Sequence, residues 1–330
     1  MSRQTVERLQ TEIEESGKHL SRLSEEMSAV IVGQHGLRDG LLRALLCDGH
    51  VLVEGVPGLA KTLAARTLAG CLDASFTRIQ FTPDLLPADL TGTMVFQPDS
   101  GTFTTRRGPL FSQMILADEI NRAPAKVQSA LLEAMQERQV TIGGASHELP
   151  RPFFVMATQN PIEQEGTYPL PEAQVDRFLL KLLVDYPTAE EEREILGRMG
   201  GHDQPEARQV LSPESILQLQ RLVDRVVVED SLVDYMVRLV EATRFPAQSG
   251  LEELAELISY GASPRATLAL QSAARAGAMM SGQAYVTPEN VKTVAHEVLR
   301  HRIIRSFEAE AEEVGVEEII DTVLDRVPVK

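Results

Sequence analysis

The sequence predicts an α/β domain with a doubly wound parallel sheet, followed by a smaller, all-helical domain. Between residues 51 and 184, short apolar runs alternate with helical stretches, which is typical of a parallel sheet covered on both faces. Beyond Tyr186-Pro187 the strand pattern stops and helix starts recur. A chain of 330 residues also suggests two domains, at about 150 residues each. We therefore expect one domain at residues 1–187 and a second at 188–330.

Five apolar runs form the predicted sheet: VLVEG at 51–55, FTRIQF at 76–81, MILAD at 114–118, FFVMATQ at 153–159 and RFLLKLLV at 177–184. The helices between them are predicted at 61–71, 124–137 and 171–176.

Two stretches do not fit this alternation, and we predict that they are inserted hairpins. The first lies within residues 85–112 and turns at Asp99-Ser100-Gly101, and the second turns at Gly143-Gly144. Because the minimal fold needs neither hairpin, both are candidates for insertions that carry function.

The second domain repeats one signature of helix starts, a hydroxyl residue followed by proline at the first helical position. The signature occurs at Ser212-Pro213, Ser263-Pro264 and Thr287-Pro288, and Thr188 with Glu191 adds a capping box.

The first 30 residues predict an amphipathic helix. Residues 6–30 carry apolar side chains at a seven-residue spacing, over too few repeats for a coiled coil, so we expect this helix to lie on its own domain. The polar, charged N-terminus is not a secretory signal. No stretch approaches the ~20 uninterrupted apolar residues of a membrane span.

Charge and cysteine content point to the cytoplasm and away from nucleic acid. The chain has 32 basic and 48 acidic residues, a net charge of −16, which disfavours non-specific binding to phosphate backbones. The cysteines, Cys47 and Cys71, are too few for a disulfide framework or a metal cluster. Their neighbours are apolar or small, so we expect buried, unreactive thiols in a reducing, cytoplasmic protein.

The segment GVPGLAKT, at residues 55–62, differs at one position from the phosphate-binding pattern G-x-x-x-x-G-K-[ST]. It follows a predicted strand and precedes a predicted helix, so its backbone N–H groups and the helix dipole would favour phosphate there. Lys61 would reach the β- and γ-phosphates, and the Thr62 hydroxyl would bind Mg²⁺. The expected nucleotide contacts are Gly55, Val56, Pro57, Gly58, Leu59, Ala60, Lys61, Thr62 and Leu63.

Ala60 stands where the pattern has its second glycine. Glycine is needed where the backbone takes a positive φ or approaches the phosphates closely, and Gly55 and Gly58 keep that capacity. Alanine is tolerated if residue 60 has already turned into the helix, so we predict that the loop still binds a nucleotide.

Two adjacent acids, Asp118 and Glu119, follow the apolar run MILA. Carboxylates at the end of such a strand lie where α/β folds bind ligands. One acid would complete a magnesium shell and the other would polarise an attacking water.

Three more residues are candidates on weaker local signals. Asn160 follows the fourth strand and would orient the water beside Glu119. Arg177 opens the fifth predicted strand and is either half of an ion pair with Asp176 or an arginine finger for a neighbouring subunit. Arg265 lies in the first turn of a helix, where a cation opposes the dipole. It either contacts a phosphate or pairs locally with Glu253 or Glu256.

These motifs resemble those of the MoxR family of AAA+ ATPases. GVPGLAKT, LADEINRAP, ATQNP, EAQVDRF and GASPRA look like the family's motifs in the family's order, and the resemblance covers nearly all of residues 25–330. Alanine before the loop lysine is familiar in MoxR-like proteins. The resemblance implies a P-loop NTPase (AAA+) fold with hairpin insertions and a helical lid, and ATP and Mg²⁺ as ligands.

The resemblance also implies roles for the candidate residues. Lys61 and Thr62 hold phosphate and magnesium, Asp118 is the metal-shell acid, Glu119 the water-activating base, Asn160 the first sensor, Arg177 the arginine finger and Arg265 the second sensor. The segment IVGQ, with Gly33 and Gln34, looks like the part that contacts adenine. It stays open whether Arg265 acts on its own nucleotide or a neighbour's.

The family further implies a ring, commonly a homo-hexamer, that remodels a partner protein, often one with a von Willebrand factor A domain. A nucleic-acid motor is the main alternative, because the same clade contains helicases and magnesium-chelatase motors. The net charge of −16 and the scarcity of basic residues in the second hairpin favour a protein partner. An ATP-dependent scaffold without turnover and a small-molecule kinase fit the adjacent acids less well.

Overall fold

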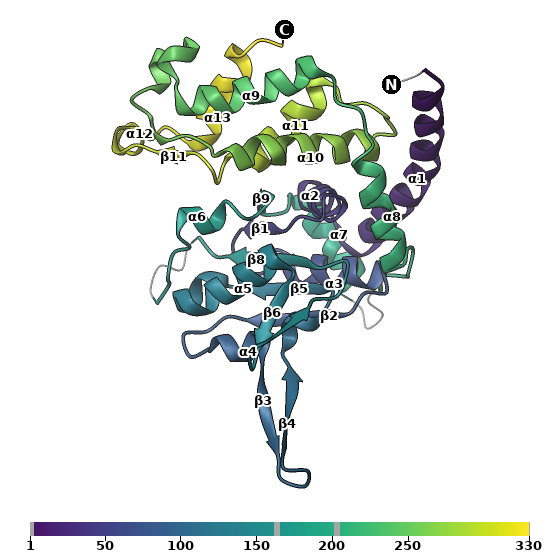
Figure 1. Ribbon diagram of the computed structural model, residues 1–330. Helices are drawn as coiled ribbons and strands as arrows, with labels where there is room; N and C mark the ends of the chain where they lie inside the picture. Colours follow the sequence, from purple (N-terminus) through teal and green to yellow (C-terminus); the bar gives the residue numbers. More distant parts are fainter. Residues whose placement is uncertain (1–2, 162–165, 201–204, 330) are drawn as a thin grey trace.

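The computed structural model describes residues 3–161, 166–200 and 205–329, and a five-stranded sheet forms its centre (Figure 1). The strands are β1 (Val51–Glu54), β2 (Phe76–Gln80), β5 (Met114–Asp118), β8 (Phe154–Gln159) and β9 (Leu180–Leu183). Their order is β2-β5-β8-β1-β9, and all neighbours are parallel, so the predicted sheet is confirmed. All five carboxyl ends therefore lie along one border of the sheet, the carboxyl edge, and all five amino ends along the opposite border, the amino edge.

Both faces of the sheet are buried, which explains the nearly continuous apolar runs. Val51 and Val53 of β1 belong to a core shared with α2 (His35–Leu46) and α3 (Lys61–Cys71). Leu52, pointing to the other face, belongs to a core shared with α4 (Pro87–Thr91) and α5 (Ala125–Glu137).

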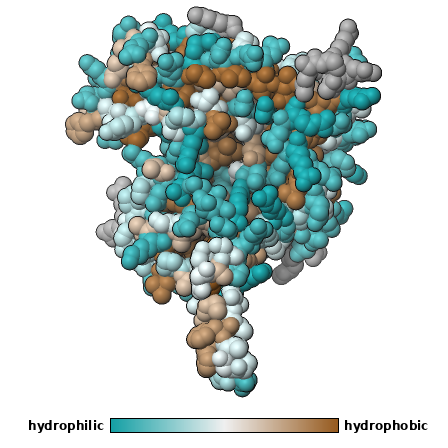
Figure 2. Space-filling model, viewed as in Figure 1, coloured by the Kyte–Doolittle hydropathy of each residue, from teal (hydrophilic) through white to brown (hydrophobic). Residues whose placement is uncertain are grey.

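Both predicted hairpins are present. The first pairs β3 (Gly92–Gln97) with β4 (Thr102–Arg107), and it projects from the body of the molecule (Figures 1 and 2). The second pairs β6 (Gln139–Ile142) with β7 (Ala145–Glu148). Its turn residues, Gly143 and Gly144, have φ of 59° and 85°, which explains the glycines there.

The C-terminal part is helical, as predicted, apart from one short strand pair. Its predicted helix starts are confirmed, because Thr188, Ser212, Ser263 and Thr287 each accept a backbone N–H with the side chain. The strand pair joins β10 (Ile258–Tyr260) to β11 (Ile304–Arg305); strands this short carry no periodic signal. The helices after the fourth sheet strand are α6 (Glu172–Val175), α7 (Ala189–Met199), α8 (Pro213–Val223), α9 (Asp230–Arg244), α10 (Pro264–Met280), α11 (Pro288–Leu299), α12 (Phe307–Ala311) and α13 (Val316–Arg326).

The N-terminal helix α1 (Arg3–Val30) is amphipathic, as predicted, but it lies on both parts of the molecule. Its buried residues include Ile13, Leu23 and Met27. The helix contacts α3 in the sheet domain and α10 in the helical part. Gln10 secures the second contact, because its amide donates to the Gly282 carbonyl at 2.8 Å and accepts from the Ala284 N–H at 3.1 Å. At 28 residues the helix is about 42 Å long, which lets one apolar stripe reach both parts.

Within the described ranges, no helix combines the length and the apolar character needed to cross a lipid bilayer. Both cysteines are free thiols, and burial raises the pKa of Cys47 and of Cys71 to about 12. Thiols with so high a pKa stay protonated at neutral pH. Cys71 is buried, as predicted, whereas Cys47 is only partly buried.

Candidate active site

The predicted phosphate loop and the residues at the ends of β5 and β8 meet at the carboxyl edge of the sheet. Together they line a cavity of about 390 Å³, here called the loop cavity. Its lining residues are Pro57, Gly58, Leu59, Ala60, Lys61, Thr62, Leu63, Arg78, Asp118, Glu119 and Asn160.

The start of α3 is built to receive an anion. Ala60, at its N-cap, offers no side-chain hydrogen bond to the first N–H groups, and the first turn contains no acid. The helix therefore presents its uncapped N–H groups and the positive end of its dipole beside the loop cavity, which suits a phosphate.

The two loop glycines are required for different reasons. Gly58 has a φ of 88°, a region that favours glycine. At Gly55 a Cβ would lie 2.7 Å from the Val184 carbonyl oxygen, so glycine lets the loop begin against the end of β9.

The condition stated for alanine at this position, that residue 60 has already turned into the helix, is not met. Ala60 has φ 56° and ψ 13°, which is left-handed backbone. Alanine adopts this conformation at a cost of about 1–2 kcal/mol. The general pattern has glycine at this position because glycine avoids that cost.

Lys61 begins α3, and its ammonium group donates to the carbonyl of Gly55 across the loop. Burial lowers the pKa of Lys61, and the carboxylates of Asp118 and Glu119 act in the opposite direction. The lysine is thus half-buried beside two acids, where a phosphate would be a stronger partner than a carbonyl.

Asp118, the last residue of β5, is buried and held on both carboxylate oxygens. Oδ1 accepts from the Thr158 hydroxyl at 2.6 Å. Oδ2 accepts from Arg78 at 3.0 Å (Nε) and 2.7 Å (Nη2). Arg78 and Thr158, which hold Asp118 in place, are contacts that the sequence patterns did not reveal, since each lies inside a strand of the sheet rather than after one.

Glu119 is fixed at the mouth of the same cavity. Its φ of 56° breaks the strand direction, and its N–H donates to the Thr158 hydroxyl at 2.9 Å. The carboxylate accepts from Gln80 at 2.8 Å and from Arg122 at 3.2 Å. This side chain is partly exposed, as a base that acts on water must be.

Thr158 therefore links the two acids, and we predict that Thr158→Val lowers kcat for nucleotide hydrolysis by about ten- to hundredfold. Valine keeps the shape but removes the hydroxyl that bonds Asp118 and Glu119, which costs about 1–3 kcal/mol at a buried site. Steady-state hydrolysis and nucleotide binding would be measured side by side. Thr158→Ser, which keeps the hydroxyl, is the matched control. A valine variant with unchanged kcat would show that the link is dispensable.

The donor set fits a magnesium ion bound together with a nucleotide. Thr62 and Asp118 supply a hydroxyl and a carboxylate to one cavity. The described residues hold no cluster of three or more His, Cys, Asp or Glu side chains suited to a metal. Mg²⁺ is usually held by one or two protein oxygens plus phosphates and water, so a site of this kind needs no larger cluster.

Gly33 and Gln34, predicted to contact adenine, do not line the loop cavity. They lie between the end of β9 and the start of α7, where the Gln34 amide donates to the Asp185 carbonyl at 2.9 Å. A Cβ at Gly33, whose φ is 63°, would collide with Glu191. Their contact with adenine stays a prediction.

Arg177 and Arg265 lie together, but at the amino edge. Both line a second cavity of about 380 Å³, the arginine cavity, which also includes His50 just before β1. Arg177 lies in the turn before β9, so the expectation that it opens the strand is wrong; the strand begins at Leu180.

The local ion pair that was one of two alternatives for each of these arginines is not found among the described residues. Asp176 pairs with Arg302 at 2.8 Å rather than with Arg177. Arg265 lies 4.0 Å from Asp176, and neither Glu253 nor Glu256 is the partner found for it. These contacts span 126 and 89 positions along the chain (302 − 176 and 265 − 176), so no local pattern indicates them.

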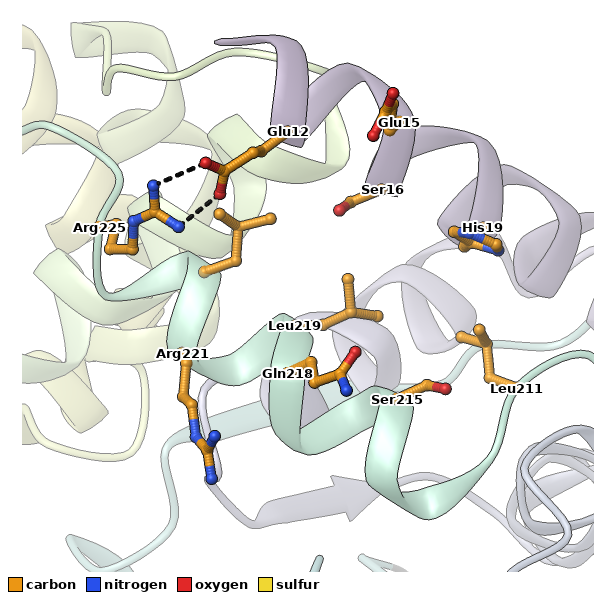
Figure 3. A pocket seen from close by; sticks show the side chains of 11 residues that line it. Glu12, Glu15, Ser16, His19, Leu211, Ser215, Gln218, Leu219, Arg221 and Arg225 are labelled. Atoms are coloured by element: carbon orange, nitrogen blue, oxygen red, sulfur yellow. Dashed lines mark hydrogen bonds and ion pairs between the residues drawn. The ribbon is translucent and has the colours of Figure 1, made fainter. Parts of the chain in front are cut away.

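A third cavity, of about 440 Å³, lies between α1 and α8 and contains none of the predicted site residues (Figure 3). Arg225 donates two hydrogen bonds to the carboxylate of Glu12 across one end of it. Both side chains are about half exposed, so the pair joins two helices at the surface without forming a reactive centre.

Comparison with known proteins identifies relatives over nearly the whole chain. Residues 50–180 match the model of the ATPase family associated with various cellular activities (AAA), and residues 252–323 match that of the AAA lid domain. Chaperone MoxR1 of Mycobacterium tuberculosis is 52% identical over 93% of this chain and 81% of its own length. Protein MoxR of Paracoccus denitrificans is 33% identical over 92% of this chain and 94% of its own. A crystal structure of a protein from Cytophaga hutchinsonii superposes with a TM-score of 0.92 at 47% identity, covering 99% of this chain and 98% of that one.

Proposed function

This chain belongs to the MoxR family of AAA ATPases, and we propose that it is a chaperone-like remodeller that forms a ring, commonly a hexamer, with active sites shared between subunits. Residues 1–187 would bind and hydrolyse ATP, and residues 188–330 would form the lid. The cytoplasm is the proposed compartment, in keeping with two free thiols.

Each subunit contributes the groups that hold and attack the nucleotide. The N-terminus of α3 and Lys61 would bind the phosphates. Thr62 with Asp118 would hold Mg²⁺, which would neutralise phosphate charge. Glu119 accepts a proton from the attacking water, and the side chain of Asn160, at the end of β8, orients that water. Gln80 and Arg122 hold the carboxylate of Glu119 by hydrogen bonds to one of its oxygens.

The placement of Arg177 and Arg265 is the observation that carries the shared-site proposal. Both lie at the amino edge, whereas the loop cavity lies at the carboxyl edge. The four residues of β1 alone separate these edges by about 13 Å. An arginine at the amino edge therefore complements a phosphate only in another subunit whose carboxyl edge faces it, and cyclic repetition of that contact closes a ring.

The projecting β3–β4 hairpin supports a protein partner over nucleic acid. Phe96 and Phe103 form a cross-strand pair with ring centres 5.3 Å apart, and both residues are more than half exposed. The two arginines of the hairpin, Arg106 and Arg107, lie at its base, and Arg107 stacks on the ring of Phe111 at 4.8 Å. Exposed apolar side chains suit contact with a polypeptide, and a partner with a von Willebrand factor A domain is the one the family implies.

One experiment tests assembly and partner class together. With ATP and Mg²⁺, sedimentation should show a closed oligomer, and the ATPase rate should change by less than about twofold when single-stranded DNA is added, because the net charge is −16. Strong stimulation by DNA would instead support the nucleic-acid motor. A chain that stays monomeric under these conditions would contradict the shared site.

A further inference from the structure

The arginine cavity contains one carboxylate that joins the two parts of the molecule. Two acids lie in this cavity, Asp48 and Asp176. Asp48 pairs with Arg138 at 3.2 Å, within the sheet domain. Asp176, at the end of α6, instead turns both of its carboxylate oxygens toward residues of the helical lid.

The first contact of Asp176 fixes the lid to the turn before β9. Oδ1 accepts from Nε of Arg302 at 2.8 Å, and Arg302 is buried, with 7% of its surface exposed. The same guanidinium donates to the carbonyls of Phe178 at 2.6 Å and Leu179 at 3.1 Å. A buried arginine with this many bonds moves only with its partners, so the turn that carries Arg177 and the end of α11 form one unit.

The second contact reaches Arg265 through the cap of α10. The Ser263 hydroxyl donates to Oδ2 of Asp176 at 2.8 Å and accepts from the N–H of Arg265 at 3.2 Å. Asp176 thereby fixes the direction of the hydroxyl that begins the helix. The guanidinium of Arg265 lies 4.0 Å from the same Oδ2, and its side chain is 51% exposed. It is close enough to Asp176 to be attracted and open enough to reach an anion from outside.

We propose that Asp176 is the positioning residue for both arginines, aligning Arg177 and Arg265 on the phosphates of a neighbouring subunit. It takes the place of that phosphate for Arg265 when the neighbour's site is empty. This inference rests on the proposed sharing of sites. Because one carboxylate links the lid, the cap of α10 and the turn before β9, the two arginines would approach the neighbour together rather than independently.

The test is Asp176→Asn in the full-length chain. Asparagine keeps the size but removes the charge, so we expect kcat for ATP hydrolysis to fall about ten- to hundredfold, as for a misplacement of about 1 Å. Binding of a fluorescent ATP analogue should stay within about twofold, because the loop cavity lies at the other edge. Asp176→Glu should recover part of the loss. Asp48→Asn, which removes the other carboxylate of this cavity, should keep the original kcat.

Non-additivity separates positioning from a general structural role. If Asp176 acts in part through Arg265, the loss of kcat in the double variant Asp176→Asn/Arg265→Ala should be smaller than the product of the two single losses. Ser263→Ala removes only the hydroxyl link and keeps the ion pair between Asp176 and Arg302, so it should lower kcat less than Asp176→Asn. It tests the same link even if the Asp176→Asn chain fails to fold. Two outcomes would overturn the role of Asp176 and leave the shared site standing. The first is a loss of kcat in the double variant equal to the product of the two single losses. The second is an unchanged kcat in Asp176→Asn while Arg265→Ala is impaired. Unchanged rates in Arg265→Ala and Arg177→Ala would overturn the shared site itself.

Discussion

Replacing Glu119 by glutamine is expected to lower kcat for ATP hydrolysis by about 10²- to 10⁴-fold while ATP binding changes by less than about twofold. Glutamine is nearly isosteric and keeps the contacts with Gln80 and Arg122 in part, but it cannot take a proton from water. The loop, Lys61 and Asp118, which hold the phosphates and the metal, are untouched. Single-turnover hydrolysis and equilibrium binding of ATP would be measured on the same preparation.

Glu137→Gln is a matched control, since Glu137 is an exposed glutamate at the end of α5 and lines none of the site's walls. It should keep the original kcat. A Glu119→Gln variant with unchanged turnover would remove Glu119 from the mechanism. If the unmodified protein binds ATP without turnover, the scaffold hypothesis would replace the ATPase.

The reactive side chains at the ends of strands could be predicted from the sequence, because the end of an apolar run marks the end of a strand. A run of apolar residues that stops at Asp118 marks both the strand and the edge of the sheet, and parallel order brings every such end to one border. Lys61 and Asn160 also follow apolar strands, which predicts that they lie at the same border, and both line the loop cavity.

The residues that hold these groups could not be predicted in the same way. Thr158 is an ordinary strand residue by composition, and its role depends on the neighbouring strand, whose Asp118 lies 40 positions away. From its neighbours in the sequence, Asp176 is a candidate to pair with the adjacent Arg177. In the structure it instead bonds Arg302 and Ser263, which lie in the lid. Contacts between distant segments leave no periodic signal in the sequence. The reactive residues can therefore be predicted from a single sequence more readily than the residues that hold them by hydrogen bonds.

Replacing Arg177 by alanine is expected to lower kcat by about 10³- to 10⁵-fold, the usual effect of losing an arginine finger, with ATP affinity nearly intact. Nε of Arg177 has no hydrogen-bond partner within the described residues, so its removal breaks no bond at that nitrogen. The variant should therefore fold and bind ATP normally, which circular dichroism and a binding titration would check. A variant with near-original turnover would contradict the finger assignment.

Mixing two inactive variants decides whether the site is shared. An Arg177→Ala subunit keeps its loop, and a Lys61→Ala subunit keeps its arginine. In a random 1:1 ring, about a quarter of the contacts would join the intact loop of the first to the intact arginine of the second. The mixture should thus regain about a quarter of the original activity. A second mixture, in which Lys61→Ala is replaced by Lys61→Ala/Arg177→Ala, should regain none. The first mixture could still show no recovery although subunit exchange is demonstrated. Each subunit would then have to hydrolyse ATP without its neighbour's arginine. The positions of Arg177 and Arg265 at the amino edge would need another explanation.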